Sequence, residues 1–166
     1  MAANELLKKS KKKICVILDE NGYKSDDLKL EGFLYELEKQ DASGRCIVIR
    51  NSFKNQGSTY EDGYNIGAML DLSSSEVDAV FASNDEVARG FKNALIKKGY
   101  DIPNDISILG FGNVKESQEK DTALNTIGID SKTLGEAFFN NFKMVFDETE
   151  CKVPAKVLIE PKLIIR

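Results

Sequence analysis

Residues 78–114 of the chain read DAVFASNDEVARGFKNALIKKGYDIPNDISILGFGNV, and their pattern indicates how the chain folds. Its first five residues, 78–82, form a short apolar run, which is typical of a strand buried on both faces. Ser83 and Glu86 have the spacing of a capping box, so a helix is expected to begin there. A second strand is predicted over residues 106–109, which makes the whole stretch a strand–helix–strand unit.

A strand–helix–strand unit of this length is a right-handed parallel crossover. In open sheets built from such units, ligands bind beyond the carboxyl ends of the strands. The segments at these ends are Ser83-Asn84-Asp85 after the first strand and Gly112-Asn113 after the second. We therefore expect any ligand site near these two segments.

The rest of the chain alternates between the same two kinds of element. Apolar runs predict strands near residues 14–18, 46–50 and 126–129, and terminal strands at 156–160 and 162–166 around Pro161. Helices are predicted at 2–9, from Ser25 to about Gln40, from Thr59 to the serines at 73–75, and from about Ser131 to Phe146. This alternation predicts an α/β fold of three layers, with a parallel sheet and helices on both of its faces.

The bulk composition is that of an ordinary soluble domain. Hydrophobic residues make up 42% of the 166 residues and charged residues 30%, and no apolar run approaches the length of a membrane span. A formal net charge of −4 argues against this chain binding nucleic acid by itself. We interpret the lysine-rich run at 8–13 as a solvated helix end rather than a nucleic-acid or membrane patch.

Several kinds of chemistry are excluded or disfavoured. The sequence contains no histidine, which removes Ser-His-Asp and Cys-His arrangements and His-ligated zinc. Cys15, Cys46 and Cys151 fit neither a disulfide framework nor a metal site, and we interpret them as reduced thiols. The glycines of Gly110-Phe111-Gly112 lack the third glycine of a dinucleotide fingerprint, because Lys115 takes its place. We therefore expect no cofactor, no metal and no enzymatic activity.

Linked motifs carry a resemblance to a known family. They are Phe81-Ala82-Ser83-Asn84-Asp85, Ala88-x-Gly90, Ile102-Pro103-x-Asp105-Ile106-Ser107 and Gly110-Phe111. Together they resemble the effector-binding core of the lactose/galactose repressor family, which is related to sugar-binding proteins of the bacterial periplasm. The resemblance covers nearly the whole chain. The family's DNA-binding headpiece and most of its N-terminal subdomain have no counterpart, so we expect a fragment of a larger regulator.

The resemblance implies a periplasmic-binding-protein-like fold of type I, of which this chain supplies the C-terminal subdomain. Residues 1–128 would form the core of that subdomain. Residues 129–153 would be a crossover strand and helix that pack on the N-terminal subdomain, and 154–166 would be closing strands. The implied function is effector sensing by a cytoplasmic, homodimeric transcriptional regulator. The effector would be a sugar or related metabolite, and DNA would be contacted only through the headpiece, with no role for a membrane.

Two alternative functions stay open at this point. The chain could belong to a solute-binding protein of a transporter, or to a sensor module of a signalling system. It could also be an enzyme on a doubly wound fold, which the missing histidine and the lack of paired carboxylates disfavour. The sequence upstream would distinguish them, because a helix-turn-helix, a signal peptide and a catalytic domain each indicate a different class.

The resemblance also implies ligand-binding residues. Asn84 matches the family's Asn that hydrogen-bonds a sugar hydroxyl. Lys29 matches a ligand-binding Arg, although Lys lacks the planar guanidinium group that can bind two oxygens. Phe53 lies near an aromatic residue that can stack on the sugar ring. The structural alternatives are a turn residue, an exposed helix lysine and a loop anchor, respectively. Asp85 is a further candidate, although we expect it to cap the helix or brace the loop rather than touch ligand.

Two positions depart from the family's pattern. Gly112 stands where the family has a ligand-binding Asp, and Ile129 stands where sugar-binding relatives carry a polar residue. Asn113 is the candidate to supply part of the ligand contact that this Asp makes in the family. We therefore expect this chain alone to bind simple sugars weakly or not at all.

The last predicted helix carries an apolar stripe. Its members are Leu134, Phe138, Phe142, Val145 and Phe146. The family's helix packs on the subdomain that is largely missing here, so this stripe would be uncovered. We expect this helix to form a dimer or a domain swap with a second copy of the chain, or to fold back onto the chain's own sheet.

Overall fold

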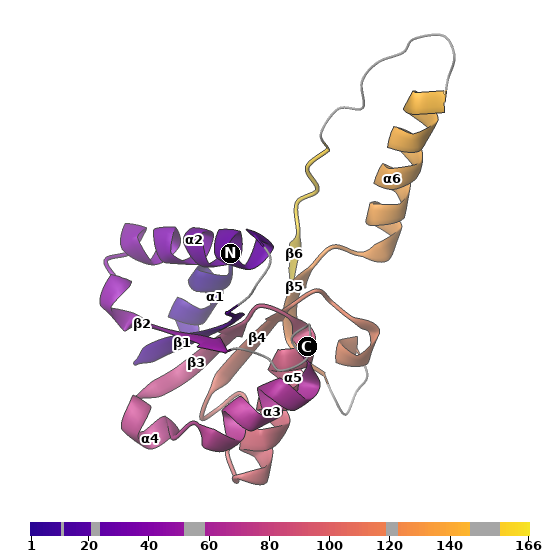
Figure 1. The fold of residues 1–166 in the computed structure, drawn as a ribbon. Coiled ribbons are helices and arrows are strands. Elements are labelled where there is room, and N and C mark those ends of the chain that lie inside the picture. Colours follow the sequence, from indigo (N-terminus) through magenta and orange to yellow (C-terminus); the bar gives the residue numbers. More distant parts are fainter. Residues whose placement is uncertain (11, 21–23, 52–58, 119–122, 147–156) are drawn as a thin grey trace.

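The computed structural model describes residues 1–10, 12–20, 24–51, 59–118, 123–146 and 157–166, with only the backbone described for residues 145 and 146. These residues form one six-stranded sheet (Figure 1). Its strands are β1 (Lys13–Asp19), β2 (Cys46–Asn51), β3 (Val77–Ala82), β4 (Ser107–Phe111), β5 (Asn125–Gly128) and β6 (Lys162–Ile164). They lie in the order β2-β1-β3-β4-β5-β6. The first five strands are parallel, as predicted, and β6 runs antiparallel to β5, which makes the sheet mixed.

The C-terminal strands differ from the prediction. Residues 157–160 are not part of any strand, and the closing strand spans 162–164 rather than 162–166. The reason is the length of β5, which has only four residues and pairs through Thr126, Ile127 and Gly128. The segment before β6 therefore has no neighbouring strand with which to exchange hydrogen bonds.

Helices cover both faces of the sheet (Figure 1). They are α1 (Ala2–Lys9), α2 (Lys24–Lys39), α3 (Tyr60–Met69), α4 (Leu72–Ser75), α5 (Asp85–Lys97) and α6 (Ser131–Phe146). One core lies between the sheet and the pair α1 and α2, and includes Leu6, Phe33, Leu37, Phe81 and Leu109. The other lies between the sheet and the pair α3 and α5, and includes Val80, Phe91, Leu95, Ile106 and Ile108. The predicted three-layer α/β architecture is therefore confirmed.

The helices α3 and α5 approach each other through glycines. A Cβ atom at Gly63 would overlap the carbonyl of Val87, and one at Gly90 would overlap the carbonyl of Tyr60. Only a residue without a side chain fits at such a backbone contact. This contact holds α5 in place, and its first residue, Asp85, follows the carboxyl end of β3 after Ser83 and Asn84.

The starts of the helices test the predicted caps. Thr59 caps α3, where a helix start was predicted, and forms a reciprocal capping box with Asp62. The cap of α5 is Asn84 and not Ser83, because the Asn84 side-chain oxygen accepts the hydrogen bond from the Val87 amide at 2.8 Å. Ser25 lies inside the first turn of α2, which begins at Lys24.

The serines at 73–75 do not end α3 but lie in a helix of their own, α4. Its cap is Asp71, whose carboxylate accepts a hydrogen bond from the Ser73 amide at 3.0 Å. A second capping side chain this close to the end of α3 starts a new turn of helix, and the chain then enters β3.

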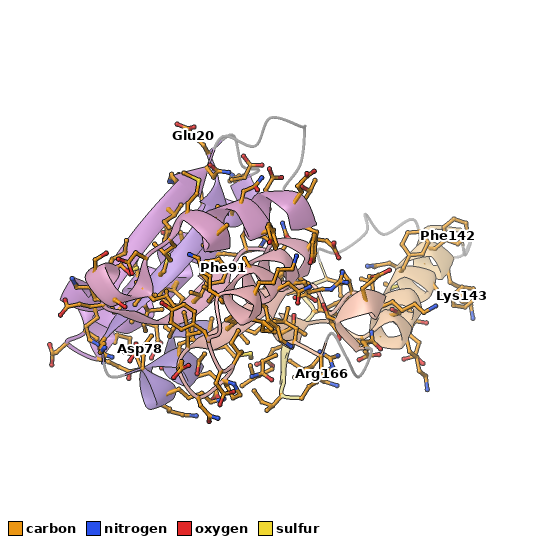
Figure 2. The ribbon with its side chains drawn as sticks, turned by 90° about the horizontal axis from the view of Figure 1, so that it is seen from below. Glu20, Asp78, Phe91, Phe142, Lys143 and Arg166 are labelled. Atoms are coloured by element: carbon orange, nitrogen blue, oxygen red, sulfur yellow. The ribbon has the colours of Figure 1, made fainter. Side chains whose placement is uncertain are left out.

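The last helix, α6, projects away from the sheet and its covering layers (Figure 1). Leu134, Phe138 and Phe142 are 53%, 72% and 50% exposed, so the expected uncovered stripe is present over these residues. The rings of Phe138 and Phe142 stack on each other, with centroids 6.4 Å apart. Figure 2 shows Phe142 on this projecting helix, well separated from Phe91 in the body of the domain. Here α6 does not fold back onto its own sheet. The Val145 and Phe146 side chains lie outside the described part of the chain.

Candidate functional site

Three segments meet at the carboxyl ends of β3 and β4, and we call this place the rim. It consists of Ser83–Asp85 after β3, Gly112–Asn113 after β4, and Lys29, which reaches over from α2. The Lys29 ammonium group donates a hydrogen bond of 3.0 Å to the carbonyl of Ser83. The structure thus brings together Asn84, Asp85, Lys29 and Asn113, four of the five candidates from the sequence.

Asn84 lies in extended backbone at the top of α5, with φ of −147°. Its side-chain oxygen caps the helix, as described above, which satisfies one of the amide groups that a helix start leaves without partners. The structural role that the sequence allowed for Asn84 is therefore real. Because the oxygen caps the helix, any ligand contact from this side chain would come from its NH2 group.

Asp85 braces the rim from below. Its side chain is fully buried, and it accepts hydrogen bonds from the Thr126 hydroxyl at 2.6 Å and from the Val114 amide at 3.0 Å. These contacts tie the start of α5 to β5 and to the loop after β4. The expectation that Asp85 braces the loop is confirmed, and its burial keeps it away from a ligand above the rim.

Lys29 has a fixed position. Its ammonium group forms an ion pair of 2.9 Å with Asp26, one turn earlier on α2, and lies 4.6 Å from the centre of the Phe111 ring. Both members of the ion pair are mostly buried, with side chains 20% and 11% exposed. Three kinds of contact therefore hold one positive charge beside the carboxyl end of β3, which an exposed helix lysine would not require.

The loop after β4 has an unusual backbone. Gly112 has φ of +128° and Asn113 has φ of +55°. The first value favours glycine, so an Asp at position 112 would be strained in this conformation. Asn113 does not simply replace that carboxylate, because its side-chain oxygen accepts a hydrogen bond of 2.6 Å from Arg166.

Two other positions named in the sequence analysis, Phe53 and Ile129, are not part of the rim as the structure describes it. Phe53 falls outside the described residues. Ile129 is half-buried, directly after β5. Two residues of the site were missed by the sequence reasoning. Phe111 was read only as part of a motif, although an aromatic residue at a strand end is a usable signal, and nothing local indicated that Arg166 reaches Asn113.

A cavity of about 240 Å³ opens beside Lys29 on the α1 and α2 side of the sheet. Its walls are mostly apolar and include Phe33, Phe81, Phe111 and Ile127. Within the described ranges, His, Cys, Asp and Glu side chains do not gather in threes as a metal site would need. The helices in that same part of the chain are too short or too polar to cross a bilayer.

Comparison with known proteins identifies the family. A periplasmic binding protein-like domain matches residues 3–166, nearly the whole chain. A probable transcriptional repressor of Bacillus subtilis, ExuR, is 32% identical over 69% of this chain and 33% of its own length. The repressor PurR of Escherichia coli is 29% identical over the whole chain and 47% of its own length. The chain thus spans between a third and a half of the length of these relatives.

Solved structures agree with this match. A LacI-family regulator of Enterococcus faecium, solved with bound ribose, is 29% identical, with a TM-score of 0.71 over 90% of this chain and 54% of that one. A LacI-family protein of Corynebacterium glutamicum shares the fold, with a TM-score of 0.81 over 99% of this chain and 60% of that one at 23% identity. The resemblance found in the sequence motifs is confirmed. The chain belongs to the periplasmic binding protein-like domain family, in the form found in LacI-family transcriptional regulators.

Proposed function

We propose that this chain is one half of the effector-binding region of a LacI-type transcriptional regulator. The observation that carries the proposal is the match of residues 3–166 to the family domain, together with a rim of polar side chains at the carboxyl ends of β3 and β4. In open α/β sheets this edge is where ligands bind. The relatives and structures named above are all regulators, and none of them is an enzyme by its description.

The effector is a sugar or a related small metabolite. Its hydroxyl groups would be met by the NH2 group of Asn84 and the ammonium group of Lys29, with Phe53 stacking on the ring. Asn113 would act through its NH2 group, because its side-chain oxygen accepts from Arg166 and its backbone amide donates to Thr126. The relative with bound ribose supports this class of ligand.

The same relationship supports a proposed domain organisation. Residues 1–128 form the core of the C-terminal subdomain, 129–153 cross to the other subdomain, and 154–166 return. The exposed stripe of α6 supports this proposal, because fully burying a large apolar side chain is worth roughly 1.5–3 kcal/mol. The other half of the regulator would cover Leu134, Phe138 and Phe142.

The regulator would work by population shift, with no bond made or broken. A ligand between the two subdomains favours the closed arrangement by its differential affinity for the closed and open states, and closure changes the affinity for DNA. DNA would be held by a headpiece outside this chain, in a cytoplasmic homodimer. The net charge of −4 is consistent with a chain that does not itself bind DNA.

A chimera tests this proposal. The matching half of the ribose-bound Enterococcus faecium regulator is replaced by this chain, and ligand binding is measured by titration calorimetry with ribose and other sugars. Asn84→Ser keeps a good helix cap but removes the NH2 group. We expect it to weaken binding by about 2- to 13-fold, the value of one neutral hydrogen bond. Lys97→Gln, on an exposed turn of α5, is the control. Equal affinities in both variants and the parent would contradict the role of the rim.

A further inference from the structure

A second cavity lies between α5 and the amino end of β5, on the sheet face opposite α1 and α2. Its volume is about 210 Å³. The buried side chains of Ile108 and Leu124 form apolar walls, and Ile102 adds to them from the loop before β4. Two positively charged side chains, Lys92 and Arg166, line the same cavity although 74 positions separate them (166 − 92).

Among the residues that the structure describes, the ammonium group of Lys92 is held by a neutral carbonyl group rather than by a carboxylate. Its ammonium group donates a hydrogen bond of 2.5 Å to the carbonyl of Ala123. An ammonium group has three donors, so two remain beyond this bond. The side chain is half-buried, and this burial lowers the pKa of Lys92. Within the described part of the chain, no carboxylate forms an ion pair with it.

Arg166 is held in the lining of the cavity by hydrogen bonds. Its guanidinium group donates to the carbonyl of Leu124 at 2.7 Å and to the side-chain oxygen of Asn113 at 2.6 Å. Its backbone amide donates to the Asn125 side chain at 2.9 Å. Two of the five guanidinium N–H groups are thus used on neutral acceptors, and no described carboxylate pairs with Arg166 either. The group is preorganised, so little ordering is needed to bind a ligand.

We propose that this cavity is a second ligand site, which takes a small organic acid. The carboxylate would lie between Lys92 and Arg166, and the hydrocarbon part would contact Ile102, Ile108 and Leu124. Charge alone would also suit inorganic phosphate, but the apolar walls favour an anion with a hydrocarbon body. This site does not depend on the function proposed for the rim.

The test uses the whole chain with isotope-labelled isoleucine methyl groups. Butyrate is the probe, butyramide has the same hydrocarbon part without the charge, and inorganic phosphate has the charge without the hydrocarbon part. We expect butyrate to shift the methyl signals of Ile102 and Ile108 in a saturable way. We expect butyramide and phosphate to leave them nearly unchanged.

Variants of α5 complete the experiment. Lys92→Gln should weaken butyrate binding by about 10- to 150-fold, the value of a hydrogen bond to a charged group. Lys92→Arg should restore most of the affinity, and Lys97→Gln, which removes the same charge outside the cavity, should not change it. A shift produced equally by butyramide, a response to phosphate alone, no response to butyrate, or equal effects of the two Gln variants would each overturn the proposal. Circular dichroism of Lys92→Gln checks that the variant is folded.

Discussion

The Thr126 hydroxyl donates a hydrogen bond of 2.6 Å to the Asp85 carboxylate, and both side chains are fully buried. The second carboxylate oxygen accepts from the Val114 amide at 3.0 Å. Asp85 is the first residue of α5, where the helix dipole also favours a negative charge. One buried carboxylate therefore joins the start of α5, β5 and the loop after β4, and so fixes the geometry of the rim.

Thr126→Val tests this joint, because it keeps the shape of the side chain and removes only the hydroxyl. We expect a loss of about 1–3 kcal/mol in the free energy of unfolding, since a buried carboxylate is left short of one hydrogen bond. Urea unfolding measures the loss. In an Asp85→Asn background the same change should cost less, because the acceptor is then uncharged. Equal losses in both backgrounds would show that Asp85 and Thr126 are not coupled.

A matched pair of glycine substitutions tests the backbone of the rim. Gly112→Ala should destabilise the chain by about 1 kcal/mol or more, because φ is +128° at this position. Gly135→Ala, in α6 with open space around the added methyl group, should stabilise by about 0.5–1 kcal/mol. Thermal unfolding measures both. Stabilisation by Gly112→Ala would mean that the loop after β4 has another conformation.

The exposed stripe of α6 predicts association of the chain when it is alone. Phe138 is 72% exposed, and burying such a side chain is worth roughly 1.5–3 kcal/mol, so Phe138→Asp should weaken self-association by at least about tenfold. Light scattering over a range of concentrations measures it. Asn140→Asp adds the same charge at a position outside the stripe and is the control. A monomer before and after Phe138→Asp would rule out a dimer through α6.

Cys15 makes stability depend on pH in the alkaline range. Burial, with a smaller contribution from Cys46, raises the pKa of Cys15 from 9.0 to about 12. The folded chain then holds a proton that the unfolded chain loses, so this contribution to stability is complete below pH 9 and is lost between pH 9 and 12. Between pH 9 and 11 the loss should be about 2 kcal/mol. Urea unfolding of the parent and Cys15→Ala measures it, and curves that stay parallel would contradict the burial of this thiol.

Much of the fold was predictable, because its elements follow from local patterns. The apolar run at 14–18 corresponds to β1 at Lys13–Asp19, and the helix predicted from Ser131 to Phe146 is α6. The cap of α5 was misplaced by one residue, since Ser83 and Asn84 are both good caps. The choice depends on where β3 ends, and a sequence pattern leaves that uncertain by a few residues.

The candidate site was predictable only in part. The topology rule placed Asn84 and Asn113 at the same edge of the sheet, and the family resemblance added Lys29. The contacts that hold them were not predictable, because they join distant segments. Arg166 lies 53 residues from Asn113, and Thr126 lies 41 residues from Asp85. No periodicity or local motif relates such pairs.

The departures at Gly112 and Ile129 predict weak binding of sugars by this chain alone. One hydrogen bond to a charged group contributes roughly 1.5–3 kcal/mol and a neutral one about 0.5–1.5 kcal/mol. Losing one of each would weaken binding by about 30- to 2,000-fold. Titration calorimetry with pentoses, hexoses and purines measures this. A dissociation constant tighter than about 10 μM, weakened in Asn84→Ser, would show that half of the cleft suffices.

The proposed function depends on a ligand site at the carboxyl ends of β3 and β4. An NMR titration of the labelled chain with the same panel of pentoses, hexoses and purines tests it most directly, because each backbone amide reports separately. We predict weak, saturable shifts for the amides of Asn84, Gly112 and Asn113 with at least one sugar. Saturable shifts confined to residues away from the rim would contradict it.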